Sequence, residues 1–324
     1  MRMRWLVAAL FFVIVPAVLA QPTVKPACDR ACLENYIDRY LDAMIAHEAS
    51  PDLFHKNCRF TENGIELPLG GEGLWYGMSG KGTYKFYVPD VETQQVAFIG
   101  TVREGGAARG AKAAPGGKPA SPTTVGVAIR LKIVEGLITE AEQLVIRPEQ
   151  SLSGPPPAST SPSTAEAVEK MGAPHEIFTQ TIPEAERMTR EELIEVGNYY
   201  FTGLQRNDGK GYYPFTDDCV RYENGKLMTT ECKKQFESGQ LKGIVTRIRD
   251  RRFVAVDRER GNVYAFGFFD HLPINWTWQL AEIFKIEKGQ IRRIEAIFHR
   301  APYGINSGWS TYEQGMSEEL QSIR

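Results

Sequence analysis

The chain lacks most of the features that would name a function directly. Its 324 residues carry a net charge of only −2 and contain no run of basic side chains. We therefore expect no nucleic-acid partner, because binding to phosphate backbones needs a basic surface. The sequence has no serine nucleophile elbow, phosphate-binding loop, dinucleotide fingerprint, zinc-protease helix or calcium loop, and its five His residues show no metal-ligand spacing. These absences predict a protein that works without a cofactor and without a metal.

Cysteine is sparse and odd in number, with five residues in the chain. Cys28 and Cys32 are four residues apart at the expected start of a helix, which brings them near disulfide range. Cys219 and Cys232 bracket a polar turn, and closing that loop would stabilise the fold by roughly 3 kcal/mol through chain entropy. Cys58 then remains unpaired. No CxxC pair occurs, so we predict structural bridges and no zinc or redox chemistry.

Long apolar runs are also scarce, and the one present is N-terminal. The run Trp5–Ala20 follows a short basic start and contains 16 residues, fewer than the roughly 20 that a membrane-spanning helix needs. It ends in Val18-Leu19-Ala20, with small residues at the positions that a signal peptidase recognises. We predict a signal peptide over residues 1–20. The mature protein is then expected to be secreted or periplasmic, with no membrane contact after the signal is removed.

An internal repeat is the clearest positive feature. Residues 58–64 (CRFTENG) recur as residues 219–225 (CVRYENG), an offset of 161, and residues 131–147 match residues 284–300 at an offset of 153. The order of the matches is kept, and the offset changes only where loops are expected. Self-similarity of this kind indicates a duplicated structural unit. The sequence therefore predicts two diverged copies of one domain, which we call copy one and copy two.

Composition sets the boundaries of the two copies. We predict copy one over residues 21–147, with a Gly- and Ala-rich loop inserted at 104–123, and copy two over residues 188–324. Residues 148–187 are rich in Ser, Pro and Thr. Such a composition buries too little apolar surface to fold alone. We therefore expect a flexible Ser/Pro-rich linker between the copies.

Each copy is expected to begin with a helix and continue in strands. Apolar residues recur at helical spacing from Leu33 onward, and Thr189 with Glu192 forms a capping box before the second helix. In the last strand of copy two, Ile294 and Ile297 lie on opposite faces, so this strand is apolar on both sides. The helices can cover one side and the sheet of the other copy the second side. We predict an α+β fold whose two sheets pack back to back as an intrachain pseudo-dimer, in a monomeric chain.

Several short motifs resemble those of a known family. They are Cys28–Leu33, Thr61–Gly64, Gly73–Trp75, Arg249–Phe253, Phe269–His271 and Pro302–Gly304. With these motifs the chain resembles tandem SnoaL-like secreted proteins of unassigned function, which belong to the nuclear transport factor two-like superfamily. The resemblance implies two tandem cone-shaped domains, each a curved antiparallel sheet wrapped on helices.

The resemblance also implies a range of activities. Enzymes of the superfamily perform acid–base chemistry inside the apolar cone, so a cofactor-independent lyase, isomerase, dehydratase or hydrolase acting on a small organic molecule is the first hypothesis. Other members bind ligands or only pair. The alternatives are therefore a non-catalytic protein that binds a small apolar or aromatic molecule, and a tandem interaction scaffold.

Three residues of copy two are candidates for acid–base catalysis. Glu282 stands among apolar neighbours, where an unpaired carboxyl has a raised pKa, and its counterpart in copy one is Ile129. Asp270 precedes His271 at the end of a strand, where neighbouring residues point to opposite faces. His299 lies on the last strand, where copy one has Ile146. We predict Glu282, Asp270 and His299 as catalytic; the alternative for Asp270 is a strand end in solvent.

Other residues are candidates for binding the substrate. Arg251 and Arg252 belong to the densest cationic cluster and could hold an anionic group, although either could instead form a buried ion pair with Glu282 or lie on a solvated face. Trp278 could line a ligand site or a core. The sequence keeps these alternatives open.

The first helix of each copy supplies three further candidates. Resemblance to scytalone dehydratase-like members implies that Asp38 and Tyr40 position substrate or water. Copy two keeps the tyrosine as Tyr200 and loses the carboxylate. The alternative is that both tyrosines belong to the cores.

Both copies keep a Glu followed five residues later by an Arg. These pairs are Glu142 with Arg147 and Glu295 with Arg300. A feature present in both halves favours an architectural role, and we expect a salt bridge at the seam between the two copies.

Overall fold

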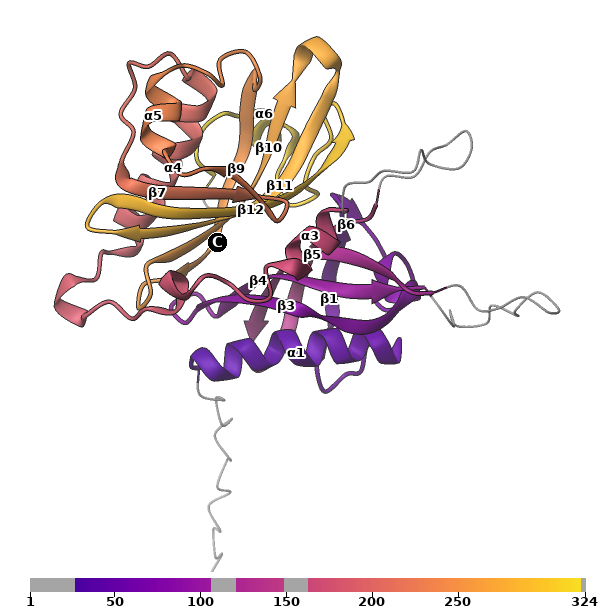
Figure 1. Cartoon of the computed structure of the whole chain (residues 1–324). Coiled ribbons are helices and arrows are strands. Elements are labelled where there is room, and N and C mark those ends of the chain that lie inside the picture. Colours follow the sequence, from indigo (N-terminus) through magenta and orange to yellow (C-terminus); the bar gives the residue numbers. More distant parts are fainter. Residues whose placement is uncertain (1–26, 106–120, 149–162, 322–324) are drawn as a thin grey trace, which may run out of the picture.

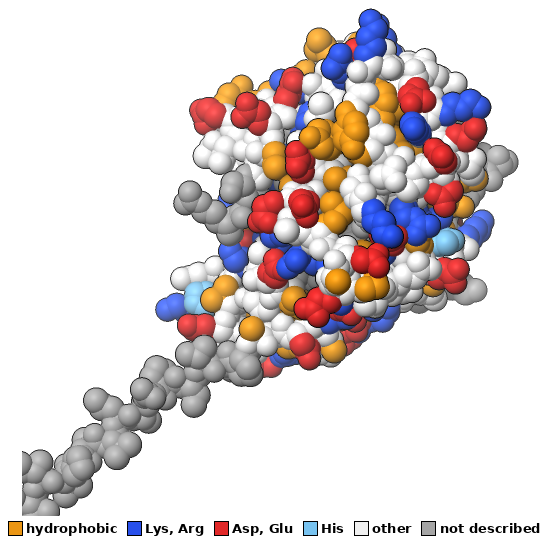
Figure 2. Space-filling view, turned by 90° about the vertical axis from the view of Figure 1, so that its left-hand side faces the viewer, with side chains coloured by type: hydrophobic (Ala, Val, Ile, Leu, Met, Phe, Trp, Pro, Cys, Tyr) orange, Lys and Arg blue, Asp and Glu red, His pale blue; other side chains and the backbone are white. Residues whose placement is uncertain are grey.

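The computed structural model describes residues 27–105, 121–148 and 163–321. The predicted signal peptide, most of the predicted inserted loop and the first part of the predicted linker lie outside these ranges. Within them, no helix is both long enough and apolar enough to cross a membrane. Acidic and basic side chains are interspersed on the face in Figure 2, as expected from the small net charge.

Copy one is a helix followed by a six-stranded sheet. Its elements are α1 (Arg30–Ala46), β1 (Phe54–Glu62), β2 (Ile65–Glu66), α2 (Leu74–Gly77), β3 (Met78–Asp90), β4 (Gln95–Glu104), β5 (Thr123–Val134) and β6 (Leu137–Ile146). The strand order is β2-β1-β6-β5-β4-β3. Asp29 caps α1, because its side chain accepts a hydrogen bond from the backbone N–H of Cys32 at 2.9 Å.

Copy two repeats this plan and adds two elements, η3 and α6. It contains α4 (Arg190–Arg206), β7 (Phe215–Glu223), β8 (Lys226–Thr229), α5 (Cys232–Glu237), β9 (Arg247–Asp257), β10 (Asn262–His271), the 3-10 turn η3 (Leu272–Ile274), β11 (Trp276–Glu287), β12 (Gln290–Pro302) and α6 (Tyr312–Met316). Its sheet order, β8-β7-β12-β11-β10-β9, is that of copy one. The predicted tandem α+β fold is confirmed, with one difference: the sheets are mixed, because β1 pairs β6, and β7 pairs β12, in parallel.

The two sheets pack against each other, and α1, α4 and α5 lie outside. Figure 1 shows α1 on the outer side of one sheet and α4 and α5 on the outer side of the other. The seam between the sheets holds one cluster of buried apolar side chains from both copies, including Tyr84, Ile99, Tyr264 and Ile283. The predicted back-to-back pseudo-dimer is therefore confirmed.

Reciprocal ion pairs give this seam approximate two-fold symmetry. Arg30 on α1 binds Asp257 of copy two with N–O distances of 2.6 and 2.8 Å, and Arg190 at the start of α4 binds Asp90 of copy one. Arg30 and Arg190 are equivalent at an offset of 160, and the two aspartates at an offset of 167. Equivalent residues thus make the same contact in both directions, as in a two-fold symmetric dimer interface.

The two glutamates predicted for the seam do lie there, with other partners than expected. Arg252 donates to both oxygens of Glu142 at 2.7 and 2.9 Å, and Tyr84 donates to Glu295 at 2.7 Å. The predicted partners, Arg147 and Arg300, are wrong. Arg147 binds Glu62 and Glu104 of its own copy, and Arg300 stacks on Trp276.

The second half of the predicted linker is folded. Residues 163–187 contain α3 (Thr164–Lys170), η1 (Glu176–Thr179) and η2 (Glu184–Glu186). A capping box of Ser163 and Glu166 starts α3, and Val168 and Phe178 are buried in the seam. The prediction of a flexible linker is wrong for this part, because two apolar anchors and a helix cap suffice to dock a segment whose average composition is polar.

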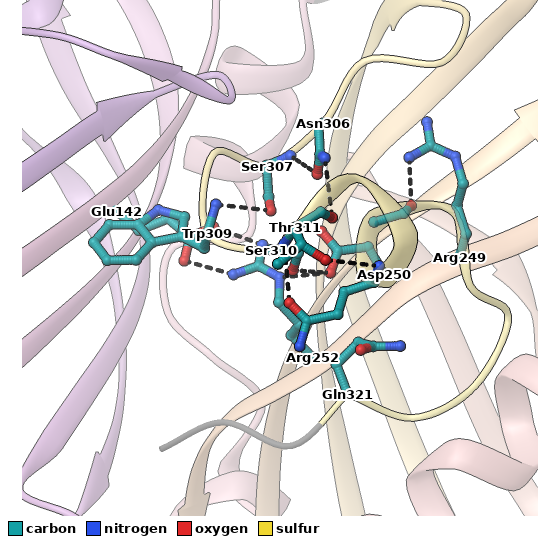
Figure 3. Close-up of polar contacts among 12 residues, drawn as sticks. Glu142, Arg249, Asp250, Arg252, Asn306, Ser307, Trp309, Ser310, Thr311 and Gln321 are labelled. Carbon is teal, nitrogen blue, oxygen red and sulfur yellow. Dashed lines mark hydrogen bonds and ion pairs between the residues drawn. The ribbon is translucent and has the colours of Figure 1, made fainter.

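The C-terminal segment contacts both copies. It leaves β12 and places Trp309 against copy one, where the indole lies 4.5 Å from Arg59 and 4.6 Å from Arg130 and donates to Thr61 at 2.8 Å. The chain then returns to copy two, where Ser310 donates to Asp250 at 2.6 Å. Figure 3 shows this segment beside the Arg252–Glu142 pair. We call residues 303–321 the C-terminal strap.

Candidate functional site

Aromatic side chains fill the inside of each cone. In copy two the buried rings of Tyr200, Phe201, Phe215, Phe236 and Phe284 pack with centroids 4.9 to 6.2 Å apart. In copy one Trp75 takes the central place and meets three other rings edge-on. Two hollows found in the described residues lie elsewhere, one beside α1 and one between the sheets. The interior of copy two is nevertheless not wholly apolar.

Glu282 points into the copy-two cone from β11. It lies directly opposite Ala265 and Ala296 on the neighbouring strands, and its residues i−2 and i+2, Leu280 and Phe284, belong to the cone core. Only 1% of Glu282 is exposed, and its Oε2 atom has no hydrogen-bond partner among the described residues. A buried carboxyl oxygen without a donor is costly and needs an explanation.

Three polar side chains surround this carboxyl. Arg221 on β7 donates to the Tyr200 hydroxyl at 3.2 Å and to Gln235 on α5 at 2.9 Å. Its Nε atom lies 3.2 Å from Glu223 Oε1. We call Glu282, Arg221, Glu223 and Tyr200 the copy-two polar group; its one guanidinium binds Glu223 and also acts on Glu282 through its charge.

Burial dominates the electrostatics of this group. It raises the pKa of Glu282 to about 8; the charge of Glu223 adds to the rise, whereas Arg221 and the Tyr200 hydroxyl oppose it. The pKa of Glu223 is raised as well, mainly by burial, with Arg221 again opposing. Glu282 can therefore both hold and release a proton near neutral pH.

Copy one provides a built-in comparison. Its equivalent of Glu223 is Glu62, whose Oε2 accepts from the Leu74 amide at 2.7 Å and from Gln143 at 2.9 Å, while Arg147 binds Oε1 at 3.0 Å. Tyr40 donates to Gln143 at 2.9 Å. Both oxygens of this carboxylate have donors. Copy one is therefore a closed polar network.

Three replacements distinguish copy two. Arg221, Glu282 and Ala296 stand where copy one has Phe60, Ile129 and Gln143. Of these, only the replacement of Ile129 by Glu282 was singled out in the sequence; the replacement of Phe60 by Arg221 was not. The available signal was a charged residue replacing Phe60 in the aligned repeat.

Asp270 and His299 do not join Glu282. Asp270 lies on the opposite face of its sheet, where Arg249 binds it at 2.9 Å, Arg247 at 2.6 Å and Thr277 at 2.7 Å. Its pKa is lowered, because these hydrogen bonds outweigh the effect of burial. A carboxylate held in this way is a structural anion. The grouping of three catalytic residues in one cavity is therefore wrong.

The neighbour of Asp270 is the residue that faces the cone. His271 lies directly opposite Trp276 across β10 and β11, and its ring is 4.2 Å from that of Trp278. Trp278, a predicted binding residue, lies near the start of β11 and stacks on Phe298 at 4.8 Å. It is on the same face as Glu282, four residues away.

Arg251 and Arg252 were predicted to bind an anionic group. Neither binds Glu282, and the two arginines have different partners. Arg252 lies in the seam with Glu142. Arg251 is buried against α4, where it donates to Thr202 at 2.9 Å and to Gln205 at 3.1 Å. Burial lowers the pKa of Arg251 to about 10. The cation beside Glu282 is Arg221.

The remaining predicted residues divide between core and surface. Tyr40 and Tyr200 are both buried in their cones, and Tyr200 belongs to the copy-two polar group. Asp38 is half-buried on α1 and accepts from two side chains of β3, Tyr87 at 3.1 Å and Lys85 at 3.3 Å. Cys28 and Cys32 form the predicted disulfide, whereas the predicted Cys219–Cys232 bridge is wrong, since both thiols are free and buried.

The half-buried side chain of His299 should make the stability of the folded protein sensitive to acid. It lies on the seam face beside Gln279 at 3.2 Å, and burial, with the charge of Arg147, lowers its pKa to about 4. The folded protein then binds fewer protons than the unfolded chain between about pH 6.5 and 4, so stability falls as the pH falls through this window. We expect His299→Gln to lose less stability than the wild type between pH 7 and 4 in urea unfolding; identical losses would contradict this.

Comparisons with known proteins agree with the domain-sized repeat. A family model described as a domain of unknown function (DUF8021) matches residues 186–298, within copy two. No curated protein matches the chain. Among solved structures, an LEH-like epoxide hydrolase from M. tuberculosis is 16% identical with a TM-score of 0.30, and the match covers 34% of this chain and 84% of that one.

Two further solved structures show the same pattern. A putative ketosteroid isomerase from Kribbella flavida is 11% identical with a TM-score of 0.29, over 34% of this chain and 80% of that one. A protein of unknown function with a cystatin-like fold from Methylobium petroleophilum is 15% identical with a TM-score of 0.29, over 43% of this chain and 97% of that one. Each match is about the length of a single copy.

Proposed function

We propose that the chain is a cofactor-independent acid–base enzyme acting on a small organic molecule, with its active site in the copy-two cone. The observation that carries this proposal is the buried Oε2 atom of Glu282. In the equivalent site of copy one, both oxygens of Glu62 have donors, whereas Glu282 Oε2 has none among residues 27–105, 121–148 and 163–321. A fold does not retain such a group for stability, and perturbed carboxyls of this kind are typical of catalytic sites.

The copy-two polar group suggests how proton transfer would proceed. Glu282, with a pKa of about 8, takes a proton from the substrate when ionised and returns it when protonated. Arg221, which binds Glu223, stabilises negative charge that develops on the substrate. The Tyr200 hydroxyl accepts a hydrogen bond from Arg221, which holds Arg221 in place, and can itself donate to the reacting atom. In this proposal copy one only supports the fold.

Access to Glu282 would require movement of α5. This helix has only six residues and is followed by the largely exposed segment 238–246. It covers the site through Gln235, which binds Arg221, and Phe236, which packs 5.4 Å from Tyr200. We propose that α5 opens to admit the substrate and closes again to exclude water.

A general probe of buried carboxylate bases tests the proposal. The probe 5-nitrobenzisoxazole opens to a coloured phenolate when a base removes its ring proton. We expect the purified protein to accelerate this reaction with a rate that rises through about pH 8, and Glu282→Gln to lower the rate by roughly 10²- to 10⁴-fold while the fold is retained. Glu295→Gln, which alters a buried seam carboxyl, is the matched control and should leave the rate unchanged.

Two outcomes would contradict this function. A wild-type rate no higher than that of acetate at equal concentration would remove the enzyme hypothesis, and a Glu282→Gln rate equal to the wild type would remove the assignment of the base. The second candidate function, a non-catalytic binder of small apolar or aromatic molecules, is favoured by the aromatic lining of the cone and would then take its place.

The proposal includes export of the mature chain. The Cys28–Cys32 disulfide supports an oxidising compartment, in line with the signal peptide predicted over residues 1–20.

A further inference from the structure

The end of the copy-two sheet next to η3 carries a row of aromatic side chains. His271 and Trp276 form one cross-strand pair, Trp278 and Arg300 form the next, and Phe298 lies beside them. Trp278 stacks on Phe298 at 4.8 Å with an interplanar angle of 26°, and the Arg300 guanidinium lies 3.9 Å from the centre of the Trp276 ring. We call these five residues the mouth strip.

Two polar atoms of the mouth strip are buried and unpartnered. His271 is only 2% exposed, and its Nε2 atom has no hydrogen-bond partner in the described part of the chain. The same holds for the buried Nε1 atom of Trp276. Since these residues face each other across two strands, both unpartnered atoms lie on one face. Buried polar atoms of this kind call for an unseen partner.

The chemistry of the two atoms defines that partner. The backbone of Ile244 hydrogen-bonds the other nitrogen of His271, and burial lowers the pKa of this imidazole, so Nε2 is left as an acceptor. The indole Nε1–H of Trp276 can only donate. A single group that both donates to one atom and accepts from the other is a hydroxyl.

The surroundings define what carries the hydroxyl. The flat faces of Trp278 and Phe298 suit an aromatic ring, which stacks on such side chains. Apolar side chains at the same end of copy two are unusually exposed; they are Ile244 at 45%, Leu272 at 62% and Ile274 at 52%. We propose that the mouth strip is a binding site for a hydroxylated aromatic compound, whose hydroxyl bridges His271 Nε2 and Trp276 Nε1 and whose ring packs on Trp278.

This site goes beyond the proposed function and does not depend on it. Trp278 and Glu282 share one face of β11 with Leu280 between them, so a molecule held at the mouth strip would lie on the way to the copy-two polar group. Binding there needs no proton transfer. Loss of Glu282 should therefore leave it intact.

Two matched probes test the inference by isothermal titration calorimetry on the full chain. We expect 2-naphthol to bind and naphthalene, which lacks only the hydroxyl, to bind roughly 3- to 10-fold more weakly, the range of a net hydrogen bond. His271→Phe and Trp276→Phe keep an aromatic ring and remove one polar atom, and each should reduce the affinity for 2-naphthol by a similar factor. Trp309→Phe, in the distant C-terminal strap, is the control and should change neither affinity.

Three results would overturn the site. They are equal affinities of the wild type for both probes, an affinity for 2-naphthol that is unchanged in both variants, and no heat of binding with either probe, as expected if a water molecule alone satisfies both atoms. Failure of the proposed function is distinguishable, because Glu282→Gln should bind 2-naphthol as the wild type does. The comparison of probes on the wild type decides the matter even if a variant fails to fold.

Discussion

Replacing Glu282 by glutamine is expected to stabilise the protein at high pH by several kcal/mol and to leave it almost unchanged at low pH. Glutamine has nearly the same shape as the protonated carboxyl and cannot ionise. The folded protein binds a proton at Glu282 with a pKa of about 8, whereas 4.5 is the ordinary value. In an isolated titration this difference corresponds to roughly 5 kcal/mol. The expected effect is therefore among the largest that a single conservative substitution can have.

The sign of this effect follows from proton linkage. Because the pKa of Glu282 is raised on folding, the folded protein holds more protons than the unfolded chain between about pH 4.5 and 8. Wild-type stability should fall as the pH rises through this window and then level off above about pH 8. The Glu282→Gln variant should lack the fall, so that its advantage grows from near zero at pH 4.5 to its full value at pH 9.

Urea unfolding of both proteins at several pH values measures this difference. Glu72→Gln, which changes an exposed carboxyl, is the control and should follow the wild-type curve. Parallel curves for Glu282→Gln and the wild type would mean that Glu282 ionises normally, and the assignment of a buried base would fall with it. A stabilised variant that has lost turnover would show that the carboxyl is kept for chemistry at the expense of stability.

Much of the fold could be predicted from the sequence because the chain contains the same signal twice. The repeat of CRFTENG as CVRYENG set the strand positions of both copies. Strands that are apolar on both faces, such as the one containing Ile294 and Ile297, required a second cover, and the other copy supplies it. Parallel pairing of β1 with β6 could not be predicted, because side-chain alternation is the same for parallel and antiparallel strands.

The candidate site was only partly predictable. Glu282 was identifiable because it replaces Ile129 of copy one, a comparison that depends on the alignment of the repeat alone. The partners of a side chain depend on strand register across the sheet and on which face each residue occupies. For this reason Asp270 and His299 were placed with Glu282, although Asp270 faces Arg249 and His299 faces the seam. Neighbouring His271 was the cone-facing residue.

The second large effect is expected at the seam, where Glu142→Leu should destabilise the protein by about 3 to 5 kcal/mol. Glu142 accepts two hydrogen bonds from Arg252, at 2.7 and 2.9 Å, and lies 3.3 Å from Arg130. All three side chains are less than 10% exposed. Removing the carboxylate leaves Arg252 with Asp250 at 3.3 Å and Arg130 with Glu140 at 2.7 Å as their remaining acidic partners. Loss of one partner from a buried ion-pair network costs far more than the pair itself contributes.

The matched control is another ion pair between the copies that lies at the surface. Arg258 and Glu92 are 2.7 Å apart, with side chains 38% and 41% exposed. Glu92→Leu should therefore cost no more than about 1 kcal/mol, because water can solvate the arginine that remains. Chemical denaturation of both variants measures the contrast, and equal costs would mean that the seam pair is hydrated.

A double variant separates two contributions to the free energy of unfolding: the cost of leaving the Arg252 charge without Glu142, and the net contribution of the Arg252–Glu142 pair. In Glu142→Leu with Arg252→Met, the Arg252 charge disappears together with its partner, and much of the lost stability should return, as when buried ion pairs are replaced by apolar residues. If it returns, the two halves are held together mainly by the apolar seam around Tyr264 and Ile99. The polar contacts then fix the orientation of one copy against the other, and this orientation places the C-terminal strap across both.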